Sequence, residues 1–229
     1  MRLLALVAAC FALAACTTTS SRTAATNQFF AAAPNAKGLL LQPDVQLSLL
    51  TATGLQERRE DWSRSAQSNL SAAIQAELKG RSHPFETLDP QASMEGRTGQ
   101  VLRLHEAVGQ SVVVFEYAGQ KLPTKKGSFD WTLGEGAKVI RDQYGADYAL
   151  FVTGRGTYAS AGRKALMVGA ALFGVGVPLG KQQVFASLVD LRTGRLVWFN
   201  VANAGPSADI RTAEGAAALA KSLLKGAPI

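Results

Sequence analysis

The feature that most constrains the fold is a pair of apolar segments, near the C-terminal end, joined by a tight turn. Residues 183–191 and 196–200 are rich in β-branched and aromatic side chains, as strands are. The turn spans 190–195, where Gly194 can adopt the positive φ that such turns need. Because apolar residues occupy both faces of the two strands, we expect them in the middle of a sheet that is covered on both sides.

The rest of the chain alternates between strand and helix patterns. Strands are predicted at 38–47, 84–88 and 147–153, and helices at 61–78, 92–118, 133–144 and 209–224. Asp61 is the predicted N-cap of the first helix. The run Val112–Phe115 alone would favour a strand, so the second half of 92–118 is ambiguous. The pattern predicts an α/β fold: a single domain with a mixed β-sheet of about four to five strands and packed helices.

The N-terminal residues have the pattern of a secretory signal peptide. Arg2 supplies a positive charge, residues 3–13 are apolar, and small residues precede Cys16. The apolar run of roughly 11–14 residues is shorter than the ~20 that a membrane-spanning helix needs. We therefore expect residues 1–15 to be a signal peptide that is removed.

The segment Leu13–Cys16 resembles the lipobox of bacterial lipoproteins. That resemblance implies lipidation of Cys16 by a diacylglyceryl group, which makes it the first residue of the mature chain. A similar pattern ends at Cys10, but too few apolar residues separate it from Arg2 to form a signal core. Thr17 stands where Asp would retain an enterobacterial lipoprotein in the inner membrane. The resemblance thus implies an outer-membrane anchor on the periplasmic face.

Residues 16–36 are rich in Thr, Ser, Ala and Asn, which predicts a lipidated flexible tether. About twenty residues of flexible coil span roughly 25 Å. The predicted periplasmic α/β domain then covers residues 37–229. Its length is typical of one domain.

Charge and cysteine content exclude several classes of function. The mature chain has 23 Lys and Arg against 17 Asp and Glu, a net charge of +6. The positive charge is dispersed, so we expect no nucleic-acid partner. A solvated surface explains the excess most simply, and affinity for anionic headgroups or peptidoglycan is the alternative. With Cys16 as the last cysteine, no disulfide framework or thiol chemistry is expected.

An apolar insert at 165–179 is flanked by Arg163, Lys164 and Lys181. As a helix it would reach about 22 Å, which is short of the ~30 Å hydrocarbon core. We expect it to be buried against the domain. The alternatives are a self-association or partner surface, and shallow insertion into a bilayer.

The sequence carries no recognised catalytic, cofactor or metal motif. The histidines are His83 and His105, and H-E-x-x-H fails because residue 109 is glycine. His105 is expected on the flank of a helix. We predict no catalytic residues, no cofactor and no metal site. Asp44, Glu57, Glu60 and Asp61 would form a carboxylate site only if the fold gathers them, and capping and turn roles are more typical.

Two further segments are candidates for binding. Lys125 and Lys126 precede Phe129 and Trp131, which suggests an aromatic and basic surface for a glycan or a partner, although Trp131 also suits a core anchor. We group these four residues with Arg163 and Lys164 as a possible partner surface. The segment 154–158, with Arg163, would bind an anion or form a plain turn.

The mature chain resembles an uncharacterised family of bacterial lipoproteins over most of residues 37–225. The resemblance rests on the segments 41–45, 129–134, 145–149 and, above all, 186–200. More distantly, the strand order and the hairpin are similar to the superfamily of the curli-secretion lipoprotein, the penicillin-binding-protein activators and the TolB amino-terminal domain. This implies an α/β fold with non-enzymatic roles in envelope assembly or export.

The predicted function is that of an outer-membrane-anchored periplasmic lipoprotein. It would act as a non-enzymatic accessory or scaffold in a cell-envelope complex, with the membrane and an unidentified envelope protein as partners, and with self-association possible. The alternative is an oligomeric component of an export channel. A third hypothesis, from another class, is a hydrolase that uses Asp44 or Glu60.

Overall fold

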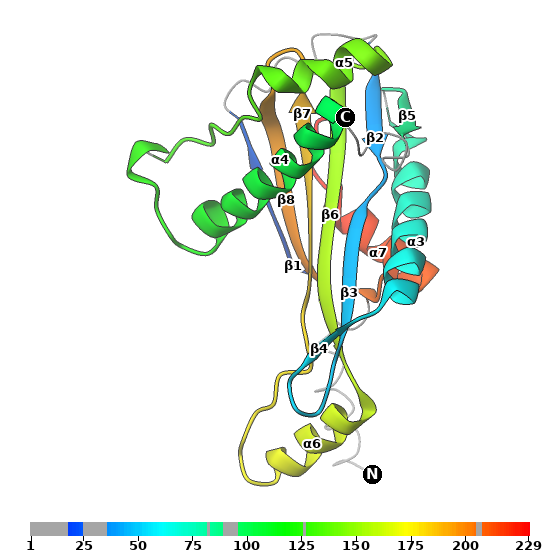
Figure 1. The fold of residues 1–229 in the computed structure, drawn as a ribbon, viewed down its shortest axis with the longest axis vertical. Helices are drawn as coiled ribbons and strands as arrows, with labels where there is room; N and C mark the ends of the chain where they lie inside the picture. Colours follow the sequence, from blue (N-terminus) through cyan, green and yellow to red (C-terminus); the bar gives the residue numbers. More distant parts are fainter. Residues whose placement is uncertain (1–17, 25–35, 82, 89–95, 126, 205–207) are drawn as a thin grey trace, which may run out of the picture.

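The computed structural model describes residues 18–24, 36–81, 83–88, 96–125, 127–204 and 208–229. They form a mixed α/β domain built on one long sheet (Figure 1). This confirms the predicted α/β class and the mixed sheet. The predicted signal peptide, with Cys10 and Cys16, lies outside the described residues, as does Lys126.

The described residues form a sheet of eight strands, so the expected four to five was too few. The strands are β1 Thr18–Thr23, β2 Gly38–Leu41, β3 Asp44–Leu50, β4 Gln56–Arg58, β5 Phe85–Leu88, β6 Tyr148–Ala159, β7 Gln182–Asp190 and β8 Arg195–Ala204. Their order is β1-β8-β7-β6-β2-β5. Strand β3 pairs with the second half of β6, and β4 pairs with β3.

Strands β2 and β3 lie one after the other along β6. Gly38 pairs with Tyr148 and Asp44 pairs with Thr153, both in parallel. The predicted single strand is interrupted at Pro43, because proline has no backbone N–H to donate to a ladder. The interruption opens the sheet locally between its two helical layers.

Helices cover both faces of the sheet, as the two-faced apolar strands predict. They are α3 Glu60–Leu78, α4 Gly96–Val112, α5 Lys138–Tyr144 and α7 Ala213–Leu223, whereas α6 Ala161–Ala171 lies at the end of the sheet and has no buried residue. One core contains Leu70 of α3 and Leu219 of α7, while the other contains Val101 of α4 and Ile140 of α5. Figure 1 shows α4 in front of the sheet, α3 beside β3 and α7 behind.

The central hairpin forms as predicted. Asp190 pairs with Arg195, and Gly194 adopts φ 72° while its N–H donates to the Asp190 carbonyl at 2.7 Å. Strand β6 is longer than predicted, because Gly154 and Gly156 continue it. A Cβ on Gly156 would lie 3.0 Å from Leu47 Cδ2, so neighbouring side chains use the space that these glycines leave.

Helix boundaries correct several expectations. The ambiguous run after Val112 is helical, since α4 continues as the π-helix η2 Val113–Tyr117. Asp61 is not an N-cap: it lies in the first turn of α3 and accepts from the Arg59 guanidinium at 2.7 and 3.0 Å. Helix α7 begins after Thr212, whose side chain accepts from the Gly215 N–H, rather than at residue 209.

The segment predicted as a flexible tether contributes a strand. Residues 18–23 form β1, which pairs antiparallel with β8, from Thr18 opposite Asn203 to Thr23 opposite Trp198. For these residues the tether prediction is wrong. An edge strand needs only backbone groups to pair, so the polar, exposed side chains of β1 did not reveal it.

Candidate functional site

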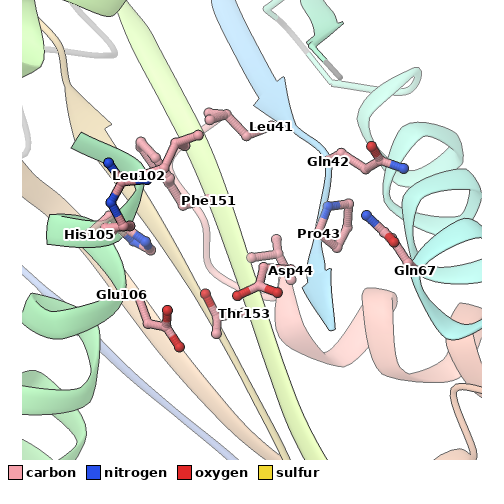
Figure 2. A pocket seen from close by; sticks show the side chains of 12 residues that line it. Leu41, Gln42, Pro43, Asp44, Gln67, Leu102, His105, Glu106, Phe151 and Thr153 are labelled. Carbon is pink, nitrogen blue, oxygen red and sulfur yellow. The ribbon is translucent and has the colours of Figure 1, made fainter. Parts of the chain in front are cut away.

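A cleft lies over β6 where the sheet is interrupted between β2 and β3 (Figure 2). It has a volume of about 340 Å³ and is bordered by α4 on one side and by α3 on the other. Its floor is Phe151 and Thr153 of β6, and Asp44, His105 and Glu106 supply the acidic and imidazole groups. The third functional hypothesis, a hydrolase that uses Asp44 or Glu60, requires these carboxylates to lie in this cleft.

The acidic groups of the cleft are held by one arginine. Arg155 of β6 donates to the Asp44 carboxylate at 2.6 Å and also to the Glu106 carboxylate. It further donates to the backbone carbonyl of Asp44 at 3.0 Å. The guanidinium therefore compensates both carboxylates and links β3 to α4 across the cleft.

The four carboxylates singled out in the sequence do not form one site. Glu60 lies in the first turn of α3, where it pairs with Arg58 at 3.2 Å in an exposed position, and it does not line the cleft. Asp61 pairs with Arg59, which lowers the pKa of that carboxyl. Among the described residues, no cluster of His, Cys, Asp and Glu is arranged to hold a metal ion.

His105 is buried, not on a helix flank as predicted. Its Nε2 atom lies 2.5 Å from the Ser187 Oγ atom of β7, and its ring stacks on Phe151 with centroids 4.1 Å apart. Burial lowers the pKa of the imidazole to about 3. The histidine is therefore neutral at physiological pH and packs within the core beneath α4.

The aromatic and basic residues near α5 are partly core. Trp131 is 8% exposed, its Nε1–H donates to Glu116 at 2.9 Å, and the Lys125 ammonium lies 4.8 Å from its ring centroid. Phe129 is partly buried against the same core. Of the two interpretations for Trp131, the core anchor is the one the structure shows.

Arg163 and Lys164 lie at the opposite end of the sheet from this cluster. The Trp131 carbonyl accepts a hydrogen bond from the Leu196 N–H, near the start of β6. Helix α6, which contains Arg163, follows the end of β6. Strand β6, which runs from Tyr148 to Ala159, spans roughly 36 Å. The six residues grouped as a partner surface are thus divided between two ends, with Lys126 outside the described residues.

Residues 154–158 form neither the plain turn nor its alternative, an anion site. These residues belong to β6, so their backbone groups pair with β3 and β7. The Arg163 guanidinium is also committed, since it donates to the carbonyls of Pro178 at 2.7 Å and Thr51 at 3.3 Å.

The apolar insert is exposed, so the expectation that it packs against the domain is wrong. We define the tip as residues 161–180, which comprise α6 and the segment that returns to β7. Helix α6 has no buried residue. Of the nine exposed large apolar side chains among the described residues, six lie in the tip and a seventh, Leu55, lies in the adjacent β3–β4 turn. The six are Leu166, Val168, Leu172, Phe173, Val175 and Leu179.

The tip projects from the end of the sheet, because it joins the last residue of β6 to the first residue of β7 at that end (Figure 1). Ser160 caps α6 by accepting from the Arg163 N–H at 3.1 Å, and its own N–H donates to the Leu50 carbonyl. A Cβ on Gly180 would lie 2.1 Å from the Thr157 carbonyl oxygen, which shows how closely the returning segment passes β6. The base of the tip is thus fixed to the sheet.

Strand β1 begins on the tip side of the sheet. Thr18 lies opposite Asn203 of β8, which lies opposite Gln183, the second residue of β7 after the tip. Thr18, the first described residue, therefore lies toward the end of the sheet that carries the exposed apolar residues. No α-helix within the described part of the chain is long and apolar enough to cross a membrane.

Comparisons with known proteins do not assign a family. No family model and no curated protein matches the chain. Among solved structures, the PelC dodecamer from Paraburkholderia phytofirmans matches at 15% identity over 91% of this chain and 92% of that chain, with a TM-score of 0.35. The lipoprotein GNA1162 from Neisseria meningitidis matches at 12% identity over 73% and 81%, with a TM-score of 0.32. The LpoB C-terminal domain from Salmonella enterica matches at 12% identity over 75% and 84%, with a TM-score of 0.29.

Proposed function

We propose that this chain is a lipoprotein that is anchored through Cys16 in the outer membrane and acts as a non-enzymatic accessory or scaffold in a cell-envelope complex. The observation that carries the proposal is strand β1. It starts two residues after Cys16 and is bonded along its length to β8. Two residues span at most about 7 Å, so a lipid on Cys16 would hold the folded domain directly against the bilayer.

A domain held in this way suits contact with neighbouring envelope components better than reaching distant ones. The chemistry of the cleft is consistent with a binding role. Asp44 and Glu106 are compensated by Arg155, and His105 is neutral and bonded to Ser187. The ionisable groups that a hydrolase would use are thus engaged in holding β3, α4 and β7 together.

The end of the sheet around α5 would face away from the membrane. It presents Lys125 above the ring of Trp131, with Phe129 half-buried beside them. Because the Trp131 ring is buried, it holds the Lys125 ammonium in place by a cation–π contact, which leaves the basic group as the element that a partner would meet. We therefore assign partner contact to this end and membrane contact to the other.

The test of lipidation is a set of substitutions at the N-terminus. Cys16→Ser should block acylation, so that mass spectrometry finds no lipid on the chain and an unprocessed precursor accumulates, while the matched variant Cys10→Ser should behave as wild type. Thr17→Asp should shift the protein toward the inner membrane. Unchanged processing of the Cys16 variant, or a wild-type chain without lipid on Cys16, would refute the anchor.

The test of the scaffold role is crosslinking of the lipidated protein in its own envelope. One recurrent partner that is lost on Lys125→Glu would support the proposal. A discrete ring of this chain alone, seen by negative-stain microscopy, would instead support the export-channel alternative.

A further inference from the structure

We propose that the tip is a second membrane attachment, one that inserts its apolar side chains into the surface of an anionic phospholipid bilayer. This deepens the proposed function by naming the partner of one surface. It does not depend on Cys16, because the binding would come from the folded domain itself.

The exposure of the tip is the first argument. Leu172 and Phe173 are 82% and 85% exposed, Val168 is 61% exposed and Val175 is 56% exposed. Outside the tip and Leu55, the only comparable side chains in the described residues are Leu104 and Val114, at 43% and 37%. Large apolar side chains gathered at one end of a molecule mark a contact surface for a protein or a membrane.

The charge of the tip is the second argument. No acidic residue occurs from Ser160 to Gln182, whereas Arg163, Lys164 and Lys181 all do. Among the described residues, neither lysine ammonium has an ion-pair partner. Apolar side chains flanked by lysines that can reach phosphate groups are typical of segments that lie in the membrane interface.

A groove at the base of the tip brings these groups together. It has a volume of about 540 Å³, and its lining includes Lys164, Lys181, Leu179, Trp62 and Tyr158, together with Asp209, whose charge is compensated by Arg211. Two ammonium groups beside apolar and aromatic side chains match the boundary between headgroups and acyl chains, where Trp and Tyr are favoured. The groove therefore extends the membrane surface from the tip onto the sheet.

The size of the tip decides the depth of insertion. Helix α6 has 11 residues, or about 16 Å at 1.5 Å per residue, which is half the ~30 Å hydrocarbon core. An interfacial segment enters roughly 5–10 Å, and the tip has enough apolar length for that depth. It lacks the length to cross the bilayer.

The position of β1 adds a geometric consequence. Thr18 lies level with Gln183 and Arg155, and the six residues from Arg155 to the start of the tip span about 20 Å. The tip thus lies further along the sheet than the lipidated end of β1. When the tip and a lipid on Cys16 are both inserted, the sheet must tilt relative to the bilayer so that its β1 edge approaches the membrane surface.

Charge also favours a bilayer over a second copy of this chain. In a two-fold symmetric contact the same patch meets itself. That contact would bring Lys164 and Lys181 of both copies together around one apolar centre, without acidic groups to compensate them. Anionic headgroups supply the missing negative charge.

The experiment is vesicle flotation with the mature chain that carries Cys16→Ser, so that no acyl group contributes. The protein should float with vesicles of phosphatidylglycerol and phosphatidylethanolamine and bind far less to phosphatidylcholine. The double variant Leu172→Ser, Phe173→Ser should reduce partitioning by at least about tenfold, given the apolar area lost. Lys164→Glu with Lys181→Glu should remove the preference for anionic lipid.

The matched control is Leu104→Ser, which removes an exposed apolar side chain away from the tip and should float as the parent does. Circular dichroism checks that each variant is folded. In a second measurement, Phe173→Trp should shift its fluorescence to the blue on addition of anionic vesicles and be quenched by brominated lipid.

The proposal is overturned if the Cys16→Ser chain stays unbound, or if the double variant floats equally well. It is also overturned if sedimentation shows a dimer that the double variant abolishes, because a second copy is then the occupant. If Cys16 is not acylated, the proposed lipid anchor is refuted, but the vesicle binding of the tip is unaffected. The lipid anchor and the tip attachment can therefore be refuted independently.

Discussion

The imidazole of His105 lies 2.5 Å from the hydroxyl of Ser187, and this contact joins α4 to the middle strand β7 inside the core. Both side chains are at most 2% exposed. A buried imidazole is tolerated there because it is neutral and hydrogen-bonded, and because its ring stacks on Phe151.

The free energy of unfolding should fall as the pH drops below about 6.5, in part through His105. Burial lowers its pKa from 6.5 to about 3 in the folded state. Above pH 6.5 the group is neutral in both states and contributes nothing to the pH dependence. Below 6.5 the unfolded chain binds a proton that the folded chain does not, which costs about 1.4 kcal/mol per pH unit until the pH nears 3.

Urea unfolding between pH 7.5 and 5 would measure this, with the slope of the unfolding free energy against pH compared between wild type and His105→Gln. The variant should have the shallower slope. Equal slopes would mean that the buried imidazole does not contribute.

Gly109→Ala should lower the free energy of unfolding by about 1–3 kcal/mol, the usual cost of overpacking. A Cβ at this position would lie 2.5 Å from the Phe185 ring, so α4 could not approach the sheet as closely. Gly169→Ala is the matched control: it also lies in a helix, but with nothing within 4 Å of the added Cβ, and it should be neutral or gain up to about 1 kcal/mol. Chemical denaturation of both variants decides the point, and an unchanged Gly109 variant would contradict it.

Paired cysteines at Thr18 and Asn203 should form a disulfide in the Cys16→Ser chain. The two residues are opposite each other in the β1–β8 ladder, and opposed Cα atoms in antiparallel strands lie about 4.5–5.5 Å apart, within disulfide reach. Thr18 paired with Gln183 should stay reduced, because that residue is one strand further away. Mass spectrometry of the oxidised proteins reads the outcome, and the reverse pattern would show that β1 does not pair as described.

Asn200→Ala should lower the free energy of unfolding by about 1–3 kcal/mol. Its side-chain amide donates to the carbonyl of Leu223 at 2.6 Å, which satisfies a buried group at the C-terminal end of α7. Gln183→Ala removes an exposed bond to Asn203 and should change stability by less than about 0.5 kcal/mol. Thermal or urea unfolding compares the two, and similar losses would argue against the buried role of Asn200.

Local patterns were sufficient to predict much of the fold. The central strands β6, β7 and β8 were recognisable because apolar residues occupy both of their faces, and the Gly194 turn because its φ of 72° suits glycine. Gly145, with φ 66° at the end of α5, ended its helix where predicted. The N-terminal signal peptide stays a prediction from the sequence, since its residues lie outside the described structure.

The candidate site was less predictable, because its features depend on what another element covers. Arg155 was interpreted as part of a turn or anion site, yet β3 and α4 bring Asp44 and Glu106 to it. His105 was placed on a helix flank, although only the position of β7 buries it. Sequence spacing does not report which side of a helix meets the sheet when polar and apolar residues are mixed.

Local periodicity and short motifs were enough to predict the α/β class and the paired central strands, and they also predict a lipobox that ends at Cys16. The tertiary structure alone decided that residues 18–23 complete the sheet edge and that the apolar insert at 165–179 is uncovered. Both depend on how far β6, β7 and β8 extend. An edge strand pairs through its backbone, and an apolar segment is buried only if another part of the chain reaches it.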